Sequence, residues 1–394
     1  MKKILIFSLS YYPHNVSGAE AAIKEITDRT HDIEFHMVTL RYNSYLPKTE
    51  KIGNILIHRI GLTTQNPSFK DLGKLPLDLN KPLYQLLTPL KAWRLHKKYK
   101  YDALWSMMAH STGVPTTIFN IFYPQIKYAL TLQEGDPIAK IEKTMRPLWP
   151  LFTKAFSQAT VVQTISAYLA DWAKKRGVKP KNIVLIYNGA NPQDFKNDTP
   201  AEELNRLKIK LNKQTNDIYL VNTARLVAQK GHDSVIRALA KLEPNIKFLL
   251  VGDGPEEDNL KKLSQELGLT SRVIFVGAVD RTEVTKYRKI SDIFVGPSRS
   301  EGLGNAFLSA MASHLPVIAT RSGGLSEFIF DQKTAWVVDK DSPQQIAEAV
   351  RDILKNPSKV KTITDSAHQM VCEKYNWDNI ATQMKEKIFK KILN

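Results

Sequence analysis

Residues 296–328 read GPSRSEGLGNAFLSAMASHLPVIATRSGGLSEF, and this stretch indicates the fold class. An apolar run over 293–298 predicts a strand that ends at Ser298, and a glycine-rich loop follows it. The pattern then predicts a helix that opens at about Asn305, and PVIAT at 316–320 predicts the next strand. A strand, a helix and a second apolar strand in this order are typical of a parallel sheet with both faces covered.

The same alternation of short apolar runs and helical patterns extends over the whole chain. In the first half, the predicted strands cover 3–10, 33–40, 55–60, 103–108, 128–133, 160–165 and 183–188. In the second half, they cover 218–224, 247–252, 273–277, 293–298, 316–320 and 335–339. Strands that are apolar throughout and separated by helices indicate parallel sheets. The sequence therefore predicts an α/β fold with two doubly wound, Rossmann-like domains that face a central cleft.

Length and composition agree with two globular domains. A chain of 394 residues can bury two cores, and we expect the break in the polar stretch near residues 189–216. The single Cys372 excludes an intramolecular disulfide framework and a multi-cysteine metal site, and it suits a reducing compartment. The first apolar run, at 4–7, is too short for a signal sequence, so we expect a soluble, cytosolic protein.

The net charge of +17 is spread unevenly along the chain. Residues 1–190 hold 26 Lys and Arg against 13 Asp and Glu, whereas residues 191–394 hold 30 against 26. A basic excess in one half indicates an anionic partner, which could be a phospholipid surface, a lipid-phosphate or acidic glycan acceptor, or nucleic acid. The alternative is a solvated face that keeps the protein in solution.

The loop after the strand at 293–298 is the first candidate for a ligand site. Glu301, Gly302 and Gly304 precede a helix, and free backbone N–H groups at a helix start favour phosphate. A second small-residue loop follows at 322–324. The alternative for both loops is that the glycines only make tight strand-to-helix turns.

Two cations follow the strand at 218–224 and form the second candidate site. Arg225 and Lys230 lie where they could converge on a diphosphate, Arg with a two-pronged fork and Lys with a point charge. The alternative is that both are ordinary surface cations of a basic protein. Gly252 and Gly254 follow the next strand, but a G-x-G without a spaced third glycine is a weak signal.

Taken in order, these segments resemble the carboxyl-terminal domain of family 4 glycosyltransferases, which have the GT-B fold. The segments that carry the resemblance are ARLVAQKGHD at 224–233, VGDGPEED at 251–258, RVIFVG at 272–277 and SRSEGLGNAFLSAMASHLPVIAT at 298–320. The first half agrees through Ser17-Gly18-Ala19-Glu20, which opens a helix, and through VVQTISAYLADWAKKRGV at 161–178 and NIVLIYNGANPQDF at 182–195. The resemblance covers nearly the whole chain, and the combination of motifs is far more specific than any one of them.

The resemblance implies different roles for the two domains. It implies an acceptor-side domain at 1–195 and a nucleotide-sugar-binding domain at 196–372, and we expect residues 373–394 to form a helix packed back on the first domain. Such enzymes transfer a sugar from a nucleotide diphosphate donor with retention at the anomeric carbon and without a required metal. The implied catalytic residues are Glu301, Arg225, Lys230 and His110. The implied donor-binding residues are Gly18, Arg225, Lys230, Gly252, Gly277, Glu301, Gly302, Gly304, Asn305, Ala306 and Ser309.

Two positions depart from the family pattern. Glu301 matches the first glutamate of the E-x7-E signature, but Ser309 stands where the second would hold the ribose hydroxyls. Gln133 stands where many relatives carry a histidine near the acceptor and the donor sugar. We interpret Glu134 and Asp136, which follow it, as acceptor-side carboxylates. Asp339-Lys340-Asp341 precedes a helical run, so we interpret Asp341 or Ser342 as a helix N-cap and expect no metal site.

Two segments concentrate the charge of the first half, namely residues 70–100 and 140–181. Both mix basic residues with leucine and aromatic side chains, which suits a helix that lies on an anionic membrane face. The alternative is an ordinary amphipathic helix packed on a sheet, with its cations reaching out to water. No nucleic-acid-binding motif accompanies the charge, so nucleic acid is not an expected partner.

The sequence thus predicts a metal-independent, retaining hexosyltransferase of cell-envelope glycan synthesis. Its co-substrate would be a nucleotide sugar, with UDP favoured over GDP, and no further cofactor is expected. The acceptor would be lipid-linked or an oligosaccharide, reached through peripheral contact of the basic domain with the cytoplasmic face of the membrane. The alternative, motivated by Ser309 and Gln133, is a catalytically weak GT-B protein that acts as a scaffold or partner of another glycosyltransferase.

Overall fold

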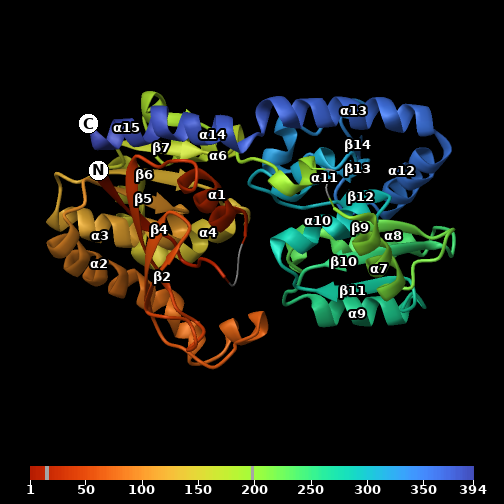
Figure 1. Ribbon diagram of the computed structural model, residues 1–394, viewed down its shortest axis with the longest axis horizontal. Helices are drawn as coiled ribbons and strands as arrows, with labels where there is room; N and C mark the ends of the chain where they lie inside the picture. Colours follow the sequence, from red (N-terminus) through yellow and green to blue (C-terminus); the bar gives the residue numbers. More distant parts are fainter. Residues whose placement is uncertain (14–16, 197–198) are drawn as a thin grey trace. The chain divides into compact units, whose positions relative to one another are not determined.

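The computed structural model describes residues 1–13, 17–196 and 199–394, and these form two compact units (Figure 1). Unit 1 comprises Met1–Asn188 and Trp377–Asn394, and unit 2 comprises Gly189–Asn376. Each unit has a central sheet of mostly parallel strands with helices packed against it. The predicted α/β class with two doubly wound domains is therefore confirmed.

Unit 1 contains an eight-stranded sheet in the order β3-β4-β2-β1-β5-β6-β7-β8. The strands are β1 (Lys2–Phe7), β2 (Ile33–Leu40), β3 (Thr49–Ile52), β4 (Ile55–Ile60), β5 (Ala103–Met107), β6 (Lys127–Leu132), β7 (Val161–Thr164) and β8 (Ile183–Leu185). All pairs are parallel except β3 with β4, and every parallel strand overlaps a predicted one. The sequence did not predict β3, because its four residues TEKI carry no apolar run.

Helices cover both faces of this sheet. They are α1 (Gly18–Thr27), α2 (Asn80–Tyr99), α3 (Val114–Phe122), α4 (Ile138–Met145), α5 (Trp149–Ser157), α6 (Ala167–Lys175), α14 (Trp377–Met384) and α15 (Lys390–Leu393). On one face, α1, α14 and α15 share a core with strand side chains such as Ile4. On the other, Tyr84 of α2 donates a hydrogen bond to the carbonyl of Ser8 at 3.0 Å, and Phe119 of α3 contacts Phe7 edge to face.

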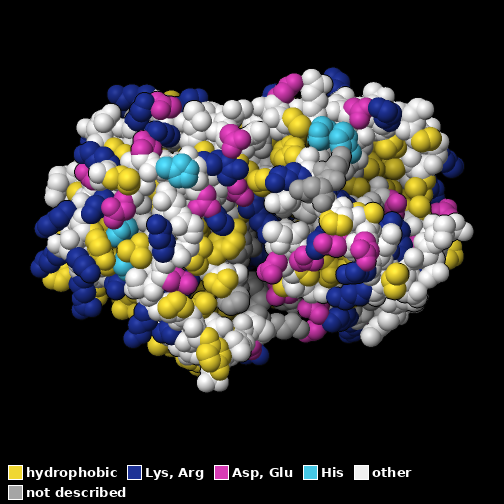
Figure 2. Space-filling model, viewed as in Figure 1, with side chains coloured by type: hydrophobic (Ala, Val, Ile, Leu, Met, Phe, Trp, Pro, Cys, Tyr) yellow, Lys and Arg dark blue, Asp and Glu magenta, His cyan; other side chains and the backbone are white. Residues whose placement is uncertain are grey.

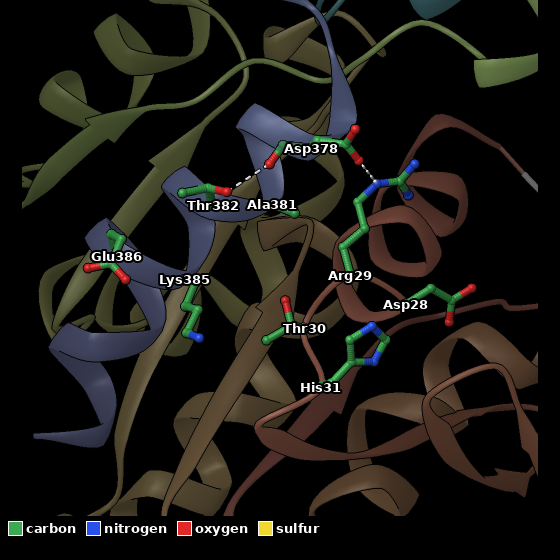
Figure 3. Close-up of a pocket in the computed structure, with 9 residues that line it drawn as sticks. All are labelled: Asp28, Arg29, Thr30, His31, Asp378, Ala381, Thr382, Lys385 and Glu386. Atoms are coloured by element: carbon green, nitrogen blue, oxygen red, sulfur yellow. Dashed lines mark hydrogen bonds and ion pairs between the residues drawn. The ribbon is translucent and has the colours of Figure 1, made fainter.

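The last segment of the chain belongs to unit 1. Figure 3 shows Arg29, at the end of α1, reaching Asp378 of α14, and its Nε donates to the carboxylate at 2.6 Å. Lys385 pairs with Asp32 at 2.8 Å. The apolar side chains that the segment buries are Trp377, Ile380, Met384, Ile388, Phe389 and Ile392. Residues 377–394 therefore complete the core on one face of the sheet.

Unit 2 contains a six-stranded sheet, all parallel, in the order β11-β10-β9-β12-β13-β14. The strands are β9 (Ile218–Thr223), β10 (Ile246–Val251), β11 (Val273–Gly277), β12 (Ile293–Gly296), β13 (Val317–Ala319) and β14 (Trp336–Val337). The helices are α7 (Ala201–Lys210), α8 (His232–Leu239), α9 (Glu257–Glu266), α10 (Arg281–Lys289), α11 (Asn305–Ala312), α12 (Pro343–Lys355) and α13 (Pro357–Lys374). Helices α8, α9 and α12 share a core with one face of the sheet, and α11 packs on the other through Phe307 and Phe294.

The start of unit 2 is anchored by a buried ion pair. Arg288 of α10 donates to both carboxylate oxygens of Asp194, at 2.7 and 2.6 Å, and both side chains are buried. Ser313 adds a third donor to the same carboxylate at 3.2 Å. A buried pair is stable only when the remaining lone pairs are also satisfied, and this geometry meets that condition.

The strand order locates where ligands should bind in each unit. In a doubly wound sheet the order reverses once, and ligands bind beyond the carboxyl ends of the strands at that point. The reversal falls between β1 and β5 in unit 1 and between β9 and β12 in unit 2. Among residues 1–13, 17–196 and 199–394, no helix combines the length and apolar character that a membrane span requires.

Candidate active site

The loops after β9 and β12 bring the two predicted anion-binding segments of unit 2 together. Lys230 Nζ donates to Glu301 Oε1 at 2.6 Å, and Ser298 Oγ donates to the same oxygen at 2.9 Å. Lys230 is mostly shielded from solvent, and Glu301 is buried. Sequence alone assigned these residues to separate motifs, whereas the structure makes them one charged cluster at the switch point.

The glycine loop at 322–324 supports the Glu301 loop from the side. The amide of Gly324 donates to the carbonyl of Glu301 at 3.0 Å. A Cβ on Gly324 would lie only 2.0 Å from the carbonyl oxygen of Gly302, so no larger residue fits without moving that loop. Gly304 precedes α11 with φ at +101°, a conformation that L-residues with side chains rarely adopt. These glycines are therefore required by the close packing of the two loops.

The amino end of α11 opens toward the same edge of the sheet. The first amides of an α-helix have no partner within the helix, and here they belong to Asn305 and Ala306. Arg225 is exposed at the end of β9. Burial raises the pKa of nearby Asp253, and the cation of Arg225 opposes that shift. The arrangement thus combines an exposed guanidinium, a paired ammonium and a helix start, all of which favour an anion.

Gly252 and Gly277 meet at the ends of β10 and β11. The amide of Gly252 donates to the carbonyl of Gly277 at 2.9 Å, and both residues have positive φ. Their positions are therefore explained by the backbone turn that ends the two strands. The predicted donor contact of either residue stays a prediction.

The hydroxyl of Ser309 makes a hydrogen bond within unit 2. Its Oγ accepts a hydrogen bond from the amide of Asn191 at 3.0 Å, and the residue is buried. Asn191 in turn donates from its side chain to the carbonyl of Arg281 at 3.3 Å. The hydroxyl that replaces the second glutamate of the family signature therefore holds the chain segment that enters unit 2.

Arg299 was not singled out in the sequence, yet it joins the loops of the charged cluster. Its Nη1 donates to the carbonyl of Ala228 at 2.5 Å, and its amide donates to the carbonyl of Gln229 at 2.7 Å. Its side chain also pairs with Asp233 at 2.8 Å and with Asp341. Asp341 is therefore an ion-pair partner, and Ser342 is the residue that precedes α12 as N-cap. The only signal in the sequence was the position of Arg299, two residues before Glu301.

The switch point of unit 1 carries Gly18, the first residue of α1. Glu20 accepts hydrogen bonds from the amide of Ser17 at 2.7 Å and from the hydroxyl of Ser10 at 2.7 Å. This capping box ties the start of α1 to the loop after β1. Glu20 is therefore a structural capping residue, and Gly18 lies where the helix begins.

His110 and Glu134 form a pair on the neighbouring loops. His110 Nδ1 lies 3.5 Å from Glu134 Oε1, although the two residues follow different strands, β5 and β6. Glu134 is buried, and its Oε2 has no hydrogen-bond partner among the described residues. Met108, just before His110, has φ at +70°, and backbone strain of this kind clusters at functional sites. The pair is therefore a candidate for proton transfer or for holding a hydroxyl group.

The other two residues of this loop have structural partners. Gln133 exchanges two side-chain hydrogen bonds with Asn188, at 3.1 and 2.9 Å. Asp136 lies 4.0 Å from Lys140, one turn later, and is partly exposed. Gln133 therefore ties the end of β6 to Asn188, where the first segment of unit 1 ends, and Asp136 stays an acceptor-side prediction.

A hollow of about 480 Å³ lies on unit 1 between the end of α1 and the C-terminal helices (Figure 3). Its lining residues are Asp28, Arg29, Thr30, His31, Asp378, Ala381, Thr382, Lys385 and Glu386. The loop at 28–32 leads into β2, so the hollow lies at the amino edge of the sheet, opposite His110 and Glu134. Within the described part of the chain, no three His, Cys, Asp or Glu side chains are grouped to hold a metal ion.

The fold is that of a glycosyltransferase of GT-B type. Residues 17–194 match the family described as Glycosyltransferase Family 4, and residues 205–370 match the family described as Glycosyl transferases group 1. A glycosyltransferase of Methanocaldococcus jannaschii that is itself uncharacterised is 34% identical, over 97% of this chain and 96% of that protein. The chain belongs to glycosyltransferase family 4.

Two further proteins are similar to this chain. A GDP-mannose-dependent alpha-(1-6)-phosphatidylinositol monomannoside mannosyltransferase of Mycobacterium tuberculosis is 30% identical, over 57% of this chain and 60% of that protein. The structure of HepE from Anabaena in complex with UDP and glucose superposes with a TM-score of 0.79 at 21% identity, and the match covers 99% of this chain and 100% of that one. At 21% identity, the match to the Anabaena structure shows a shared fold and no more.

Arg299→Gln should lower the rate of sugar transfer by about a hundredfold, because the loop that carries Lys230 loses its side-chain anchor to the Glu301 loop and keeps only the backbone bond at Gln229 and the Lys230–Glu301 pair. Arg299→Lys should recover only part of the rate, since one ammonium nitrogen cannot reach the three acceptors that the Nε, Nη1 and Nη2 atoms of Arg299 bond separately. The matched control is Arg206→Gln, which removes an exposed pair with Glu202. Equal rates for Arg299→Gln and Arg206→Gln, with equal thermal stability, would contradict a positioning role for Arg299.

Proposed function

We propose that this protein is a retaining hexosyltransferase that moves the sugar of a nucleotide diphosphate donor onto a glycan or lipid-linked acceptor, without a metal ion. The observation that carries the proposal is the cluster at the switch point of unit 2. Cleavage of the bond between the sugar and the diphosphate leaves negative charge on the leaving group. Arg225, Lys230 and the start of α11 are positive groups that would stabilise this charge, and Glu301 holds Lys230 in place.

We propose a UDP-sugar as the donor in preference to a GDP-sugar. The superposed Anabaena structure holds UDP and glucose, whereas the mycobacterial relative is named for GDP-mannose. Both are nucleotide diphosphate sugars, so the role of the cations is the same for either base. The experiment below therefore varies both the nucleotide base and the sugar of the donor.

We assign the acceptor to unit 1. The buried carboxylate of Glu134, paired with His110, would accept the proton or hold the hydroxyl that attacks the sugar. The mycobacterial relative is named for a phosphatidylinositol-linked acceptor, which supports a lipid-linked acceptor in cell-envelope synthesis. We accordingly place the protein on the cytoplasmic side of the membrane, in peripheral contact with it.

Donor turnover tests the proposal. Purified protein in buffer with a chelator is offered UDP-, GDP- and ADP-sugars, and binding and slow hydrolysis are measured. Glu301→Gln should reduce hydrolysis and transfer by about a hundredfold, because it removes the contact with the donor sugar. It should keep or raise the affinity for the nucleoside diphosphate, since Lys230 then loses its internal counter-ion. Hydrolysis at the wild-type rate by Glu301→Gln would contradict the assignment.

A second variant separates the acceptor side from the donor side. Glu134→Gln keeps the shape of the side chain but removes its charge, so transfer should fall by about a hundredfold. Donor binding should be unchanged, because Arg225, Lys230 and Glu301 lie in the other unit. Asp136→Asn, measured in parallel, shows which of the two predicted acceptor carboxylates contributes more to the rate of transfer. Normal transfer by Glu134→Gln would remove this residue from the reaction.

The second candidate function is a catalytically weak scaffold for another glycosyltransferase. The observation that favours it is Ser309, whose hydroxyl is buried against the amide of Asn191 in place of a carboxylate. A scaffold would neither bind nor hydrolyse any donor of the panel. Saturable hydrolysis of one donor, lost in Arg225→Ala, would exclude it.

A further inference from the structure

An apolar stripe runs along the solvent-facing side of α2. Leu86, Leu90 and Trp93 are 62%, 57% and 41% exposed, and Leu79, which has helical dihedrals just before the helix, is 44% exposed. At 100° per residue these four positions fall within an arc of about 60°. They therefore form one continuous line of large apolar side chains in water.

The opposite side of α2 is the one that packs on the sheet. Tyr84, Thr88, Ala92 and Leu95 are buried there, on average half a turn away from the stripe. A surface helix of a globular protein normally shows charged and polar residues on its outer face. The stripe is thus a second apolar face that does not pack against the core of unit 1. Exposed apolar patches of this kind mark interaction surfaces.

Positive charge flanks the stripe, and the only carboxylates of the basic segment at 70–100 are Asp71 and Asp78, the second of which directly precedes Leu79. Residues 79–101 contain no Asp or Glu. The cations of this segment are Lys81, Lys91, Arg94, Lys97, Lys98 and Lys100. At 100° per residue, Arg94, Lys97 and Lys98 lie within about 110° of the middle of the stripe, whereas Lys81 and Lys91 lie farther round the helix. The ammonium of Lys97 lies 3.8 Å from the centre of the Trp93 ring, so charge and apolar surface are in direct contact. Figure 2 shows Lys and Arg side chains interspersed with hydrophobic ones over the part of unit 1 where Figure 1 places α2 and α3.

The other basic segment, at 140–181, is built differently. Its large apolar side chains Phe152, Phe156 and Trp172 are buried and pack against one another. The guanidinium of Arg176 covers the ring of Trp149 at 4.0 Å. Phe152, Phe156 and Trp172 therefore serve the core, Trp149 is half-buried beneath Arg176, and Tyr168 is the one aromatic residue of this segment that is exposed. The cations around them are those of an ordinary amphipathic surface. The sequence could not separate the two segments, whereas the exposure of their apolar side chains does.

We propose that the outer face of α2, comprising Leu79, Leu86, Leu90, Trp93 and the flanking cations Arg94, Lys97 and Lys98, docks on an anionic lipid bilayer. The leucines and the tryptophan would enter the boundary between headgroups and acyl chains, and the cations would lie among the lipid phosphates. Charge complementarity favours this occupant over a second copy of the chain, since two such faces would repel each other. This face of the protein would meet the membrane during the proposed transfer to a lipid-linked acceptor, and in that respect the inference rests on the proposed function.

The experiment is sedimentation of the full-length protein with vesicles of phosphatidylcholine, with and without phosphatidylglycerol. The stripe variant is Leu86→Gln, Leu90→Gln and Trp93→Gln together. The charge variant is Arg94→Gln, Lys97→Gln and Lys98→Gln together. The matched control is Lys175→Gln, Lys179→Gln and Lys181→Gln, which removes the same charge from exposed positions of the other segment.

The wild type and the control should bind the anionic vesicles, and added salt should weaken the binding. The charge variant should lose about a hundredfold in partitioning, because each cation at an anionic surface contributes about a fivefold gain. The stripe variant should also lose at least about tenfold, since its apolar contacts with the bilayer are removed. Unchanged thermal unfolding would show that these exposed substitutions leave the fold intact.

Three results would overturn the docking surface. They are no binding of the wild type to either vesicle, wild-type binding by the stripe variant, and equal losses in the charge variant and the control. The last would mean that net charge alone decides the partitioning. Donor hydrolysis in vesicle-free buffer should be the same in wild type and stripe variant. A wild type that binds vesicles but hydrolyses no donor would contradict the proposed function and leave the docking surface standing.

Discussion

The ion pair between Lys230 and Glu301 is the interaction on which the candidate donor site depends. It joins the loop after β9 to the loop after β12 at 2.6 Å, in a place largely closed to water. Removing two charges from water costs free energy, and the pair recovers that cost only when its geometry is good and further hydrogen bonds are made. Ser298 supplies such a bond to the carboxylate. Glu301 thus acts as an internal counter-ion that holds Lys230 in position before an anion arrives.

Several neighbouring features follow from the need to keep these two loops together. Gly324 is small because the backbone of Gly302 passes directly beside it. Arg299 bonds the backbone of the Lys230 loop and also two carboxylates. A site whose donors are fixed in advance spends little free energy on reorganisation when the ligand binds. The loops of unit 2 are therefore held together where we propose that the donor diphosphate binds. The His110–Glu134 pair of unit 1 is the separate place where we propose proton transfer.

Much of the fold could be predicted from the sequence, because buried parallel strands are apolar runs that alternate with helical patterns. The strand β3 could not, since four residues at a sheet edge leave no hydrophobic signal. The residues of the candidate donor site in unit 2 could be predicted as separate motifs, but the contact between Lys230 and Glu301 could not. His110 and Glu134 are 24 positions apart, and only the parallel pairing of β5 with β6 brings them within 3.5 Å. Likewise, the sequence shows two similar basic segments, and side-chain burial alone distinguishes them.

The central claim is that Arg225 and Lys230 hold the diphosphate of the donor, and the most direct test compares nucleoside diphosphates with monophosphates. Calorimetry would give the affinities of UDP, UMP, GDP and GMP for the wild type and for Arg225→Ala. We expect one diphosphate to bind at least about tenfold more tightly than its monophosphate, and Arg225→Ala to remove most of this difference. Equal affinities for diphosphate and monophosphate in the wild type, or an unchanged ratio in the variant, would contradict it.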